Sequence, residues 1–98
     1  MPNVEIFCSP LCGACEEAKE YFRGRGIEYT CREVRWDQQA DDWADSENAQ
    51  RMKQLCDNAD FVPQILINGQ HVNGWRALKE LIQNGKIDTL IATHPSSP

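Results

Sequence analysis

The stretch Cys8-Ser9-Pro10-Leu11-Cys12-Gly13-Ala14-Cys15 places two cysteines, Cys12 and Cys15, on either side of two small residues. The preceding residues 4–7 are rich in strand formers, and apolar side chains recur downstream at three- and four-residue steps, as on one face of a helix. The pair is therefore predicted to lie where a strand leads into a helix, with Cys12 at the helix start.

The predicted position of Cys12 has a chemical consequence. Unpaired backbone N–H groups and the positive end of the helix dipole favour a thiolate over a thiol there, and a thiolate is the attacking species in disulfide exchange. Cys15 is expected one turn inside the helix and less exposed. The pattern predicts that Cys12 attacks a disulfide and that Cys15 resolves the mixed disulfide.

Two metal-binding interpretations compete with this dithiol. Cys8, Cys12 and Cys15 have the Cys-x3-Cys-x2-Cys spacing of radical S-adenosylmethionine enzymes, but those need a partial (β/α) barrel, and a full barrel takes roughly 250 residues. Structural zinc usually takes two pairs of ligands, and this sequence carries one such pair. We therefore predict no metal site and interpret Cys8 as a small apolar residue at a strand end.

Composition narrows the class of protein. The chain has 98 residues, 41% of them hydrophobic, which fits a single domain over residues 1–98. The net charge of −5 argues against a nucleic-acid partner. An odd number of cysteines, with neither a signal peptide nor a membrane-length apolar run, predicts a cytoplasmic protein that does not associate with membranes. We expect a monomer.

The chain after the first helix predicts a second strand and an acidic segment. Residues 27–34 alternate apolar with polar side chains, which predicts a half-buried strand parallel to the first. The acidic residues 36–45 include Trp36 and Trp43, and we expect a solvated loop or short helix with one tryptophan folded onto the core. A partner-facing surface is the alternative, because exposed tryptophans often anchor interfaces.

The next segment predicts a helix and a β-hairpin. Ser46 is a candidate N-cap for a helix. One face of that helix is expected to be buried, and its residues are Ala49, Met52, Leu55 and Cys56. Residues 61–67 predict a strand, Asn68-Gly69 a hairpin turn, and residues 70–72 a returning strand in which His71 faces solvent.

The remaining residues predict helical structure and a tail. Asn73-Gly74 is expected to open a helix whose inner face carries Leu78, Leu81 and Ile82. A last helical turn is expected over residues 86–91 and a disordered tail over about 93–98.

With these elements in this order, the chain resembles the glutaredoxins, of the thioredoxin fold, from about residue 4 to residue 91. The matching segments are residues 6–15, Val62-Pro63-Gln64-Ile65-Leu66-Ile67-Asn68-Gly69 and Val72-Asn73-Gly74. The resemblance implies an α/β fold with a central four-stranded mixed sheet flanked by helices. It also implies a thiol–disulfide oxidoreductase that reduces protein disulfides or glutathione mixed disulfides.

The resemblance assigns roles to particular residues. Cys12 is the implied nucleophile, Cys15 the resolving thiol, and Pro63 the cis proline that faces the dithiol. The implied substrate-binding residues are Gly13, Ala14, Val62, Pro63, Gly74, Trp75 and Arg76. Glutathione is the implied co-substrate, and the implied partners are glutathione and proteins that contain disulfides.

Three departures from the usual glutaredoxin pattern concern the same surface. Gly13-Ala14 replaces the familiar Pro-Tyr pair, and Ser9 stands where relatives that use glutathione commonly carry a lysine. The usual Gly-Gly-x-Asp-Asp run is represented by residues 73–77, which carry no acidic side chain. Arg76 is expected to repel the γ-glutamyl ammonium group of glutathione.

These departures leave two alternatives within the family. Asn73-Gly74-Trp75-Arg76 is similar to the Ser-Gly-Phe-Arg segment of redoxins that are reduced by thioredoxin reductase and donate electrons to ribonucleotide reductase. Small residues after Cys12 are similar to those of members that bind a two-iron, two-sulfur cluster between two subunits with help from glutathione. A redox-inert interaction module that uses the acidic residues 36–43 is a third possibility, from a different class.

Overall fold

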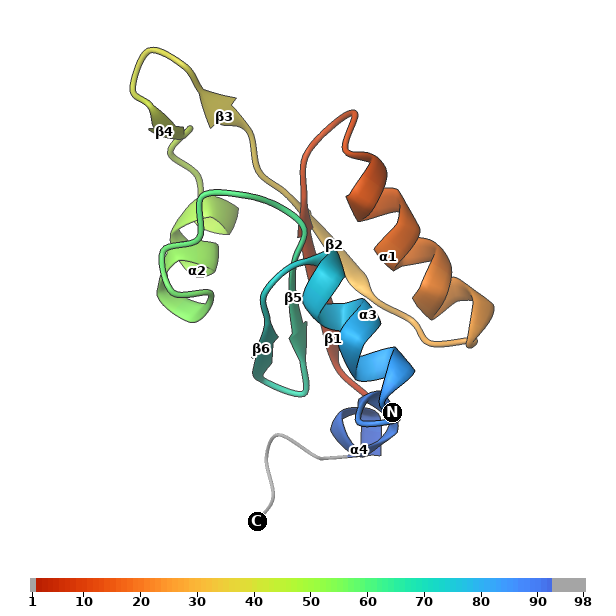
Figure 1. Ribbon diagram of the computed structural model, residues 1–98. Coiled ribbons are helices and arrows are strands. Elements are labelled where there is room, and N and C mark those ends of the chain that lie inside the picture. Colours follow the sequence, from red (N-terminus) through yellow and green to blue (C-terminus); the bar gives the residue numbers. More distant parts are fainter. Residues whose placement is uncertain (1, 93–98) are drawn as a thin grey trace.

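The computed structural model describes residues 2–92, which form a four-stranded sheet with helices on both faces and a separate small hairpin (Figure 1). In chain order the elements are β1 (Val4–Cys8), α1 (Gly13–Gly24), β2 (Thr30–Glu33), β3 (Trp36–Asp37), β4 (Asp42–Trp43), α2 (Glu47–Leu55), β5 (Gln64–Ile67), β6 (Gln70–Val72), α3 (Trp75–Gln83) and α4 (Ile87–Ala92). The predicted α/β class is confirmed. The tail expected over residues 93–98 lies outside the described residues.

The main sheet has the strand order β2-β1-β5-β6. β1 pairs in parallel with β2, with Ile6 opposite Cys31, and this confirms the predicted βαβ unit. β1 runs antiparallel to β5, and β5 antiparallel to β6, so the sheet is mixed. β2 is shorter than predicted, because Gly26 has a φ of +69° and the N–H of Ile27 bonds the Phe22 carbonyl at 2.9 Å, which closes α1.

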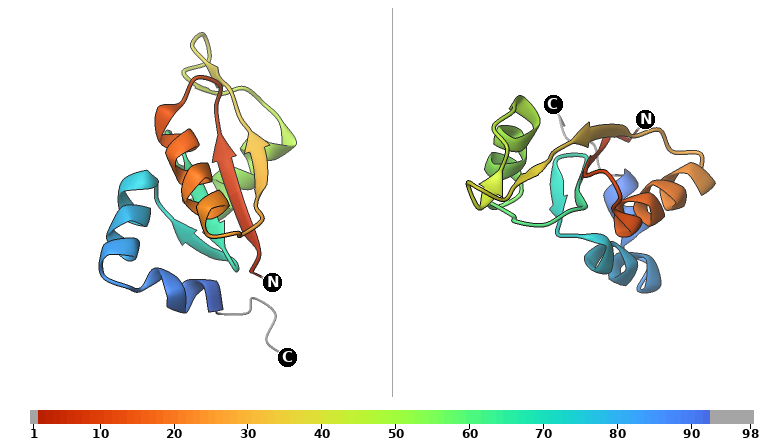
Figure 2. Two further views of the ribbon diagram at one scale, coloured as in Figure 1. Left: turned by 90° about the vertical axis from the view of Figure 1, so that its right-hand side faces the viewer. Right: turned by 90° about the horizontal axis from the view of Figure 1, so that it is seen from above.

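The central strand β1 is buried on both faces, and each face packs against a different layer of helices. Val4 and Ile6 belong to a core cluster shared with α1 and α3, whereas Phe7 belongs to a cluster shared with α2 (Figure 2). Glu5 is also buried, on the α2 side, where it accepts hydrogen bonds from Arg51 and Arg32 at 2.6–2.8 Å. These charge-assisted bonds compensate the burial of the carboxylate.

The acidic segment forms a hairpin, β3–β4, so the prediction of a loop or short helix is wrong. The hairpin extends away from the main sheet near α2 (Figure 1). Trp36 and Trp43 face each other across it, edge to face, with their ring centroids 5.0 Å apart. Trp43 is buried and its indole donates to the Ala59 carbonyl at 2.8 Å, whereas Trp36 is 41% exposed. One tryptophan is therefore folded onto the core, as predicted.

The predictions for α2 are confirmed except for Leu55. The Ser46 side chain accepts a hydrogen bond from the Ala49 amide at 3.0 Å, which makes Ser46 the N-cap. Met52 and Cys56 are buried in the α2-side cluster. Leu55 is 43% exposed, because the short helix ends there and residue 55 faces away from the sheet.

The β5–β6 hairpin turns at Asn68-Gly69, where both residues have positive φ, as a two-residue type I′ turn requires. The strand β5 begins at Gln64, later than predicted, after a cis Val62–Pro63 peptide bond. The prediction that His71 faces solvent holds only in part, because its side chain is half-buried. Its Nε2 lies 2.6 Å from the Oε1 of Gln64, and burial lowers the pKa of the His71 imidazole.

The two C-terminal helices follow the prediction. α3 begins after Gly74 and buries Leu78, while Leu81 and Ile82 are half-buried against the same cluster. α4 occupies the predicted last helical turn. Within residues 2–92, no helix is long and apolar enough to cross a membrane.

Candidate active site

Cys12 is the N-cap residue of α1, as the sequence predicts. Its backbone is extended, with φ −101° and ψ 106°, and its Sγ accepts a hydrogen bond from the Cys15 amide at 3.2 Å. The Cys12 carbonyl accepts the next helical bond, from Glu16. The sulfur therefore lies at the positive end of the helix dipole and accepts from a backbone N–H, which is the position that the sequence predicts for the attacking thiol.

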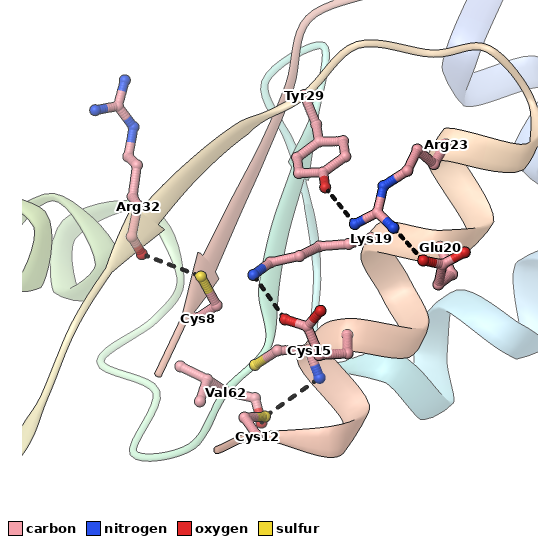
Figure 3. A network of polar contacts seen from close by, with 10 residues as sticks. Cys8, Cys12, Cys15, Lys19, Glu20, Arg23, Tyr29, Arg32 and Val62 are labelled. Carbon is pink, nitrogen blue, oxygen red and sulfur yellow. Dashed lines mark hydrogen bonds and ion pairs between the residues drawn. The ribbon is translucent and has the colours of Figure 1, made fainter. Parts of the chain in front are cut away.

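The loop before β5 brings a second contact to Cys12. In its thiol form, Cys12 donates to the Val62 carbonyl, with Sγ and oxygen 3.9 Å apart (Figure 3). The Val62–Pro63 peptide bond is cis, as the resemblance implies, and Pro63 is fully buried. Residues 12 and 62, fifty positions apart, thus form one site.

Cys15 lies behind Cys12 and has no exposed surface. Burial first, and then the neighbouring Cys12, raise the pKa of the Cys15 thiol to about 12. Cys15 therefore stays protonated near neutral pH, whereas Cys12 is half-buried and open to solvent. This asymmetry suits an attacking thiol in front and a resolving thiol behind.

The start of α3 borders the site through Phe61. Gly74 has φ +98°, and a Cβ placed there would lie 2.9 Å from the Phe61 ring and 3.8 Å from the Pro63 carbonyl oxygen. Trp75 is half-buried, and the Nζ of Lys79 lies over its ring, 5.7 Å from the ring centroid. Arg76 is exposed. The structure therefore connects the α3 start to the Val62–Pro63 loop.

On the other side of Cys12 the surface is hollowed into a groove between α1, β1 and β2, which we call the thiol groove. Its lining residues are Cys8, Ser9, Pro10, Leu11, Cys12, Gly13, Glu16, Lys19, Cys31 and Glu33. Ser9 lines the groove with its hydroxyl already bonded, because it donates to the Val34 carbonyl at 2.8 Å. Lys19 of α1 forms a salt bridge with Glu16 at 2.9 Å. It brings a positive charge to the groove, where Ser9 stands in place of the lysine common among relatives that use glutathione.

Sequence reasoning missed several residues of this site. Leu11 is fully exposed with φ +60°, and Phe61 is 46% exposed, so two apolar side chains are presented next in sequence to Cys12 and Val62. Lys19 and Cys31 reach the thiol groove from separate elements. The parallel βαβ arrangement was the available signal for Cys31, because it fixes which β2 side chains lie on the α1 side of the sheet.

The fold and this dithiol define the class of protein. The glutaredoxin family model matches residues 4–72, so the chain belongs to the glutaredoxin family, thiol–disulfide oxidoreductases of the thioredoxin superfamily. The match ends just before the Gly74-Trp75-Arg76 segment, where the sequence departs from the usual pattern.

Individual relatives agree with this membership. A glutaredoxin of Neisseria meningitidis is 32% identical over 93% of this chain and 98% of its own length. A probable glutaredoxin of Synechocystis is 30% identical over 96% of this chain and 79% of its own length. The crystal structure of a buckwheat glutaredoxin–glutathione complex superposes with a TM-score of 0.68 at 25% identity, over 90% of this chain and 74% of the buckwheat chain.

Proposed function

We propose that this protein is a dithiol glutaredoxin that reduces protein disulfides or glutathione mixed disulfides through Cys12 and Cys15. The observation that carries the proposal is the position of Cys12, with its sulfur 3.2 Å from the Cys15 amide and 3.9 Å from the Val62 carbonyl. Cys12 attacks a substrate disulfide, a mixed disulfide forms on its sulfur, and one substrate thiolate leaves. Cys15 then gives its proton to the departed thiolate, attacks the Cys12 sulfur and expels the second thiolate, so that two protein thiols become one disulfide and the substrate disulfide is reduced.

Substitution of each cysteine separates the two steps. Cys12→Ser should abolish reduction of every disulfide substrate, because the attacking sulfur is lost. Cys15→Ser should block reduction of protein disulfides and leave reduction of glutathione mixed disulfides, which needs one thiol. Cys56→Ala, at a buried cysteine of the α2-side cluster, is the matched control and should keep its activity. Full activity of Cys12→Ser in a disulfide reduction assay would overturn the proposal.

We propose glutathione as the reductant, with the thiol groove and the Val62–Pro63 loop as its contact surfaces. The solved complex of the buckwheat relative with glutathione supports this choice. Arg76 is exposed at the first turn of α3, where a cation opposes the helix dipole and the ammonium group of glutathione. We therefore expect Arg76→Asp to increase the rate of reduction of the Cys12–Cys15 disulfide by glutathione by about threefold to tenfold.

Arg76→Gln separates loss of the positive charge from gain of a carboxylate, and it should give a smaller increase in the rate of reduction by glutathione.

In a parallel experiment, the Cys12–Cys15 disulfide is reduced with NADPH and thioredoxin reductase. Faster reduction by the reductase than by glutathione, with a loss of that rate in Arg76→Asp, would assign Trp75 and Arg76 to reductase docking. The protein would then be a redoxin of the kind that donates electrons to ribonucleotide reductase.

Binding of a two-iron, two-sulfur cluster is the second candidate, favoured by the open space beside Cys12. Gly13 is exposed and a Cβ added to it would meet nothing within 4 Å. Cys12 is the residue that would ligate such a cluster between two subunits, with glutathione supplying further thiolates. Anaerobic reconstitution with iron, sulfide and glutathione should then give a brown dimer, and a colourless monomer would remove this candidate.

A further inference from the structure

A second pair of thiols lies in the thiol groove, apart from Cys12 and Cys15. In the parallel ladder Ile6 is opposite Cys31, and Cys8 follows Ile6 by two residues, so Cys8 and Cys31 point to the same face of the sheet as diagonal neighbours. Both line the groove. The electrostatics agree with this placement, because burial first, and then the Cys31 thiol, raise the pKa of Cys8 to about 12.

The two thiols differ in access in the same way as the active-site pair. Cys8 is 3% exposed and lies beneath the groove, where its Sγ is 4.0 Å from the Arg32 carbonyl. Cys31 is exposed on β2, an edge strand of the sheet. A reagent that enters the groove therefore reaches Cys31 before Cys8.

Lys19 brings a positive charge to the groove that holds both thiols. Its amino group extends from α1 toward the side of β1 that carries Cys8 (Figure 3). The hydrogen bond to Glu16 raises the pKa of Lys19 most, and the charges of Cys8 and Cys31 raise it further, so the lysine stays cationic beside both thiols. A fixed cation in the groove attracts an anionic disulfide such as glutathione disulfide.

We propose that Cys8 and Cys31 form a second redox-active dithiol, which is oxidised by low-molecular-weight disulfides such as glutathione disulfide. The groove has a volume of about 530 Å³, within the range of small-molecule sites. This dithiol does not rest on the function proposed for Cys12 and Cys15, since neither of those residues takes part in its chemistry.

The reaction is a complete exchange. The Cys31 thiolate attacks one sulfur of the small disulfide, the sulfur–sulfur bond breaks, and one small thiolate leaves. Cys8 gives its proton to that thiolate and attacks the Cys31 sulfur, and the second small thiolate departs. Two protein thiols are oxidised to one disulfide while one small disulfide is reduced to two thiols.

Closure of the Cys8–Cys31 disulfide requires β2 to move. Diagonal neighbours on adjacent strands lie about 7–8 Å apart, and a disulfide needs Cα atoms within about 6.8 Å. β2 is an edge strand hydrogen-bonded to β1 alone in the main sheet of the described residues, so it can shift without breaking a second ladder. In the described residues Cys8 and Cys31 are free and their side chains are not joined.

The test isolates the pair in the full chain. The variant Cys12→Ser/Cys15→Ser/Cys56→Ala is incubated with excess glutathione disulfide and followed by intact mass and thiol labelling. We expect the mass to fall by two hydrogens, with no glutathionyl group retained and with recovery of both thiols on reduction. The same variant with Cys8→Ala should instead stop at one glutathionyl group on Cys31.

Two results overturn the proposal: addition of a separate glutathionyl group to each cysteine, or no reaction at Cys31. If the multiple variant does not fold, as judged by circular dichroism, the wild-type chain is oxidised and digested. A peptide linked through Cys8 and Cys31 supports the proposal, and linkage of Cys8 to Cys12 or Cys15 contradicts it. Because the isolated pair lacks Cys12, this result is independent of the active-site assays.

The lysine is tested separately in the isolated-pair background. Lys19→Gln should slow the first glutathionylation of Cys31 at least about threefold at low ionic strength and have less effect at high salt, which screens the attraction between the lysine and the carboxylates of glutathione disulfide. Lys86→Gln makes the same charge change outside the groove and should leave the rate unchanged. Equal rates for the two variants would remove Lys19 from the site.

Discussion

Gly74 is the residue at which the site depends most directly on the absence of a side chain. Its φ of +98° and ψ of 173° fall in a region that is essentially restricted to glycine. A Cβ there would also lie 2.9 Å from the Phe61 ring. We expect Gly74→Ala to lower the free energy of unfolding by at least about 1–3 kcal/mol. It should also reduce disulfide exchange, because Phe61 leads into the Val62–Pro63 loop. Urea unfolding and a disulfide reduction assay measure the two effects.

Gly85 provides the matched control for this prediction. Its φ is also positive, at +78°, but a Cβ there would meet nothing within 4 Å. Gly85→Ala should lower the free energy of unfolding by about 1 kcal/mol through backbone strain alone. It should leave disulfide exchange unchanged. Equal stability and activity losses in the two variants would show that the Phe61 contact contributes nothing.

The β5–β6 turn joins three elements through one side chain. Asn68 accepts a hydrogen bond from the Asn3 amide at 2.8 Å, which fastens the chain just before β1. It also donates to the Leu90 and Ile91 carbonyls of α4 at 2.9 and 3.1 Å. Because Asn68 is buried, its loss leaves these groups without a partner in an apolar setting.

We expect Asn68→Gly to lower the free energy of unfolding by about 2–3 kcal/mol, because glycine keeps the positive φ of the turn and removes only the side-chain bonds. Asn68→Ala should lower the free energy of unfolding by about 1 kcal/mol more, because alanine is strained at the positive φ of this position. Hydrogen exchange should accelerate in α4 in both variants. Asn84→Gly, which removes one exposed local bond to Lys86, is the control. Unchanged α4 exchange in Asn68→Gly would contradict the assignment.

Across the whole molecule, the parts that could be predicted from sequence are those set by local pattern. Strand-forming residues followed by helical spacing predict the junction of β1 and α1, where the cysteine pair lies. Asn68-Gly69 predicts the β5–β6 hairpin. The N-cap role of Ser46 is likewise a local hydrogen bond. These features need only residues a few positions apart.

The parts that could not be predicted depend on packing between distant segments. Three-residue steps group Leu55 with Ala49 and Met52, but at about 3.6 residues per turn such steps drift around the helix, so Leu55 leaves the buried face and is 43% exposed. His71 is drawn inward by the buried Gln64 side chain of the neighbouring strand. Lys19 and Cys31 enter the thiol groove only because the strand register and the rotation of α1 bring them there. No sequence pattern within α1 or β2 predicts that Lys19 and Cys31 line the same groove.

Burial of thiols on both faces of the sheet predicts a loss of stability at alkaline pH. Cys8, Cys15 and Cys56 are each at most 3% exposed. Burial raises the pKa of Cys56 to about 11, while an ordinary thiol titrates near about 8.5. Between these values the native protein holds protons that the unfolded chain releases. Stability is therefore complete below roughly pH 8.5 and falls as pH rises toward the native pKa values.

The slope of the free energy of unfolding against pH can be measured with and without one of these thiols. Each buried thiol can lower the free energy of unfolding by up to about 1.4 kcal/mol per pH unit within its window. Urea unfolding of Cys56→Ala across this range should show a shallower decline than the wild type. Leu55→Ala, at an exposed neighbour without a titrating group, should decline like the wild type. A Cys56→Ala slope equal to that of the wild type would mean that this thiol ionises as readily in the folded protein as in the unfolded chain. The alkaline sensitivity would then belong to Cys8 and Cys15, the thiols nearest the site.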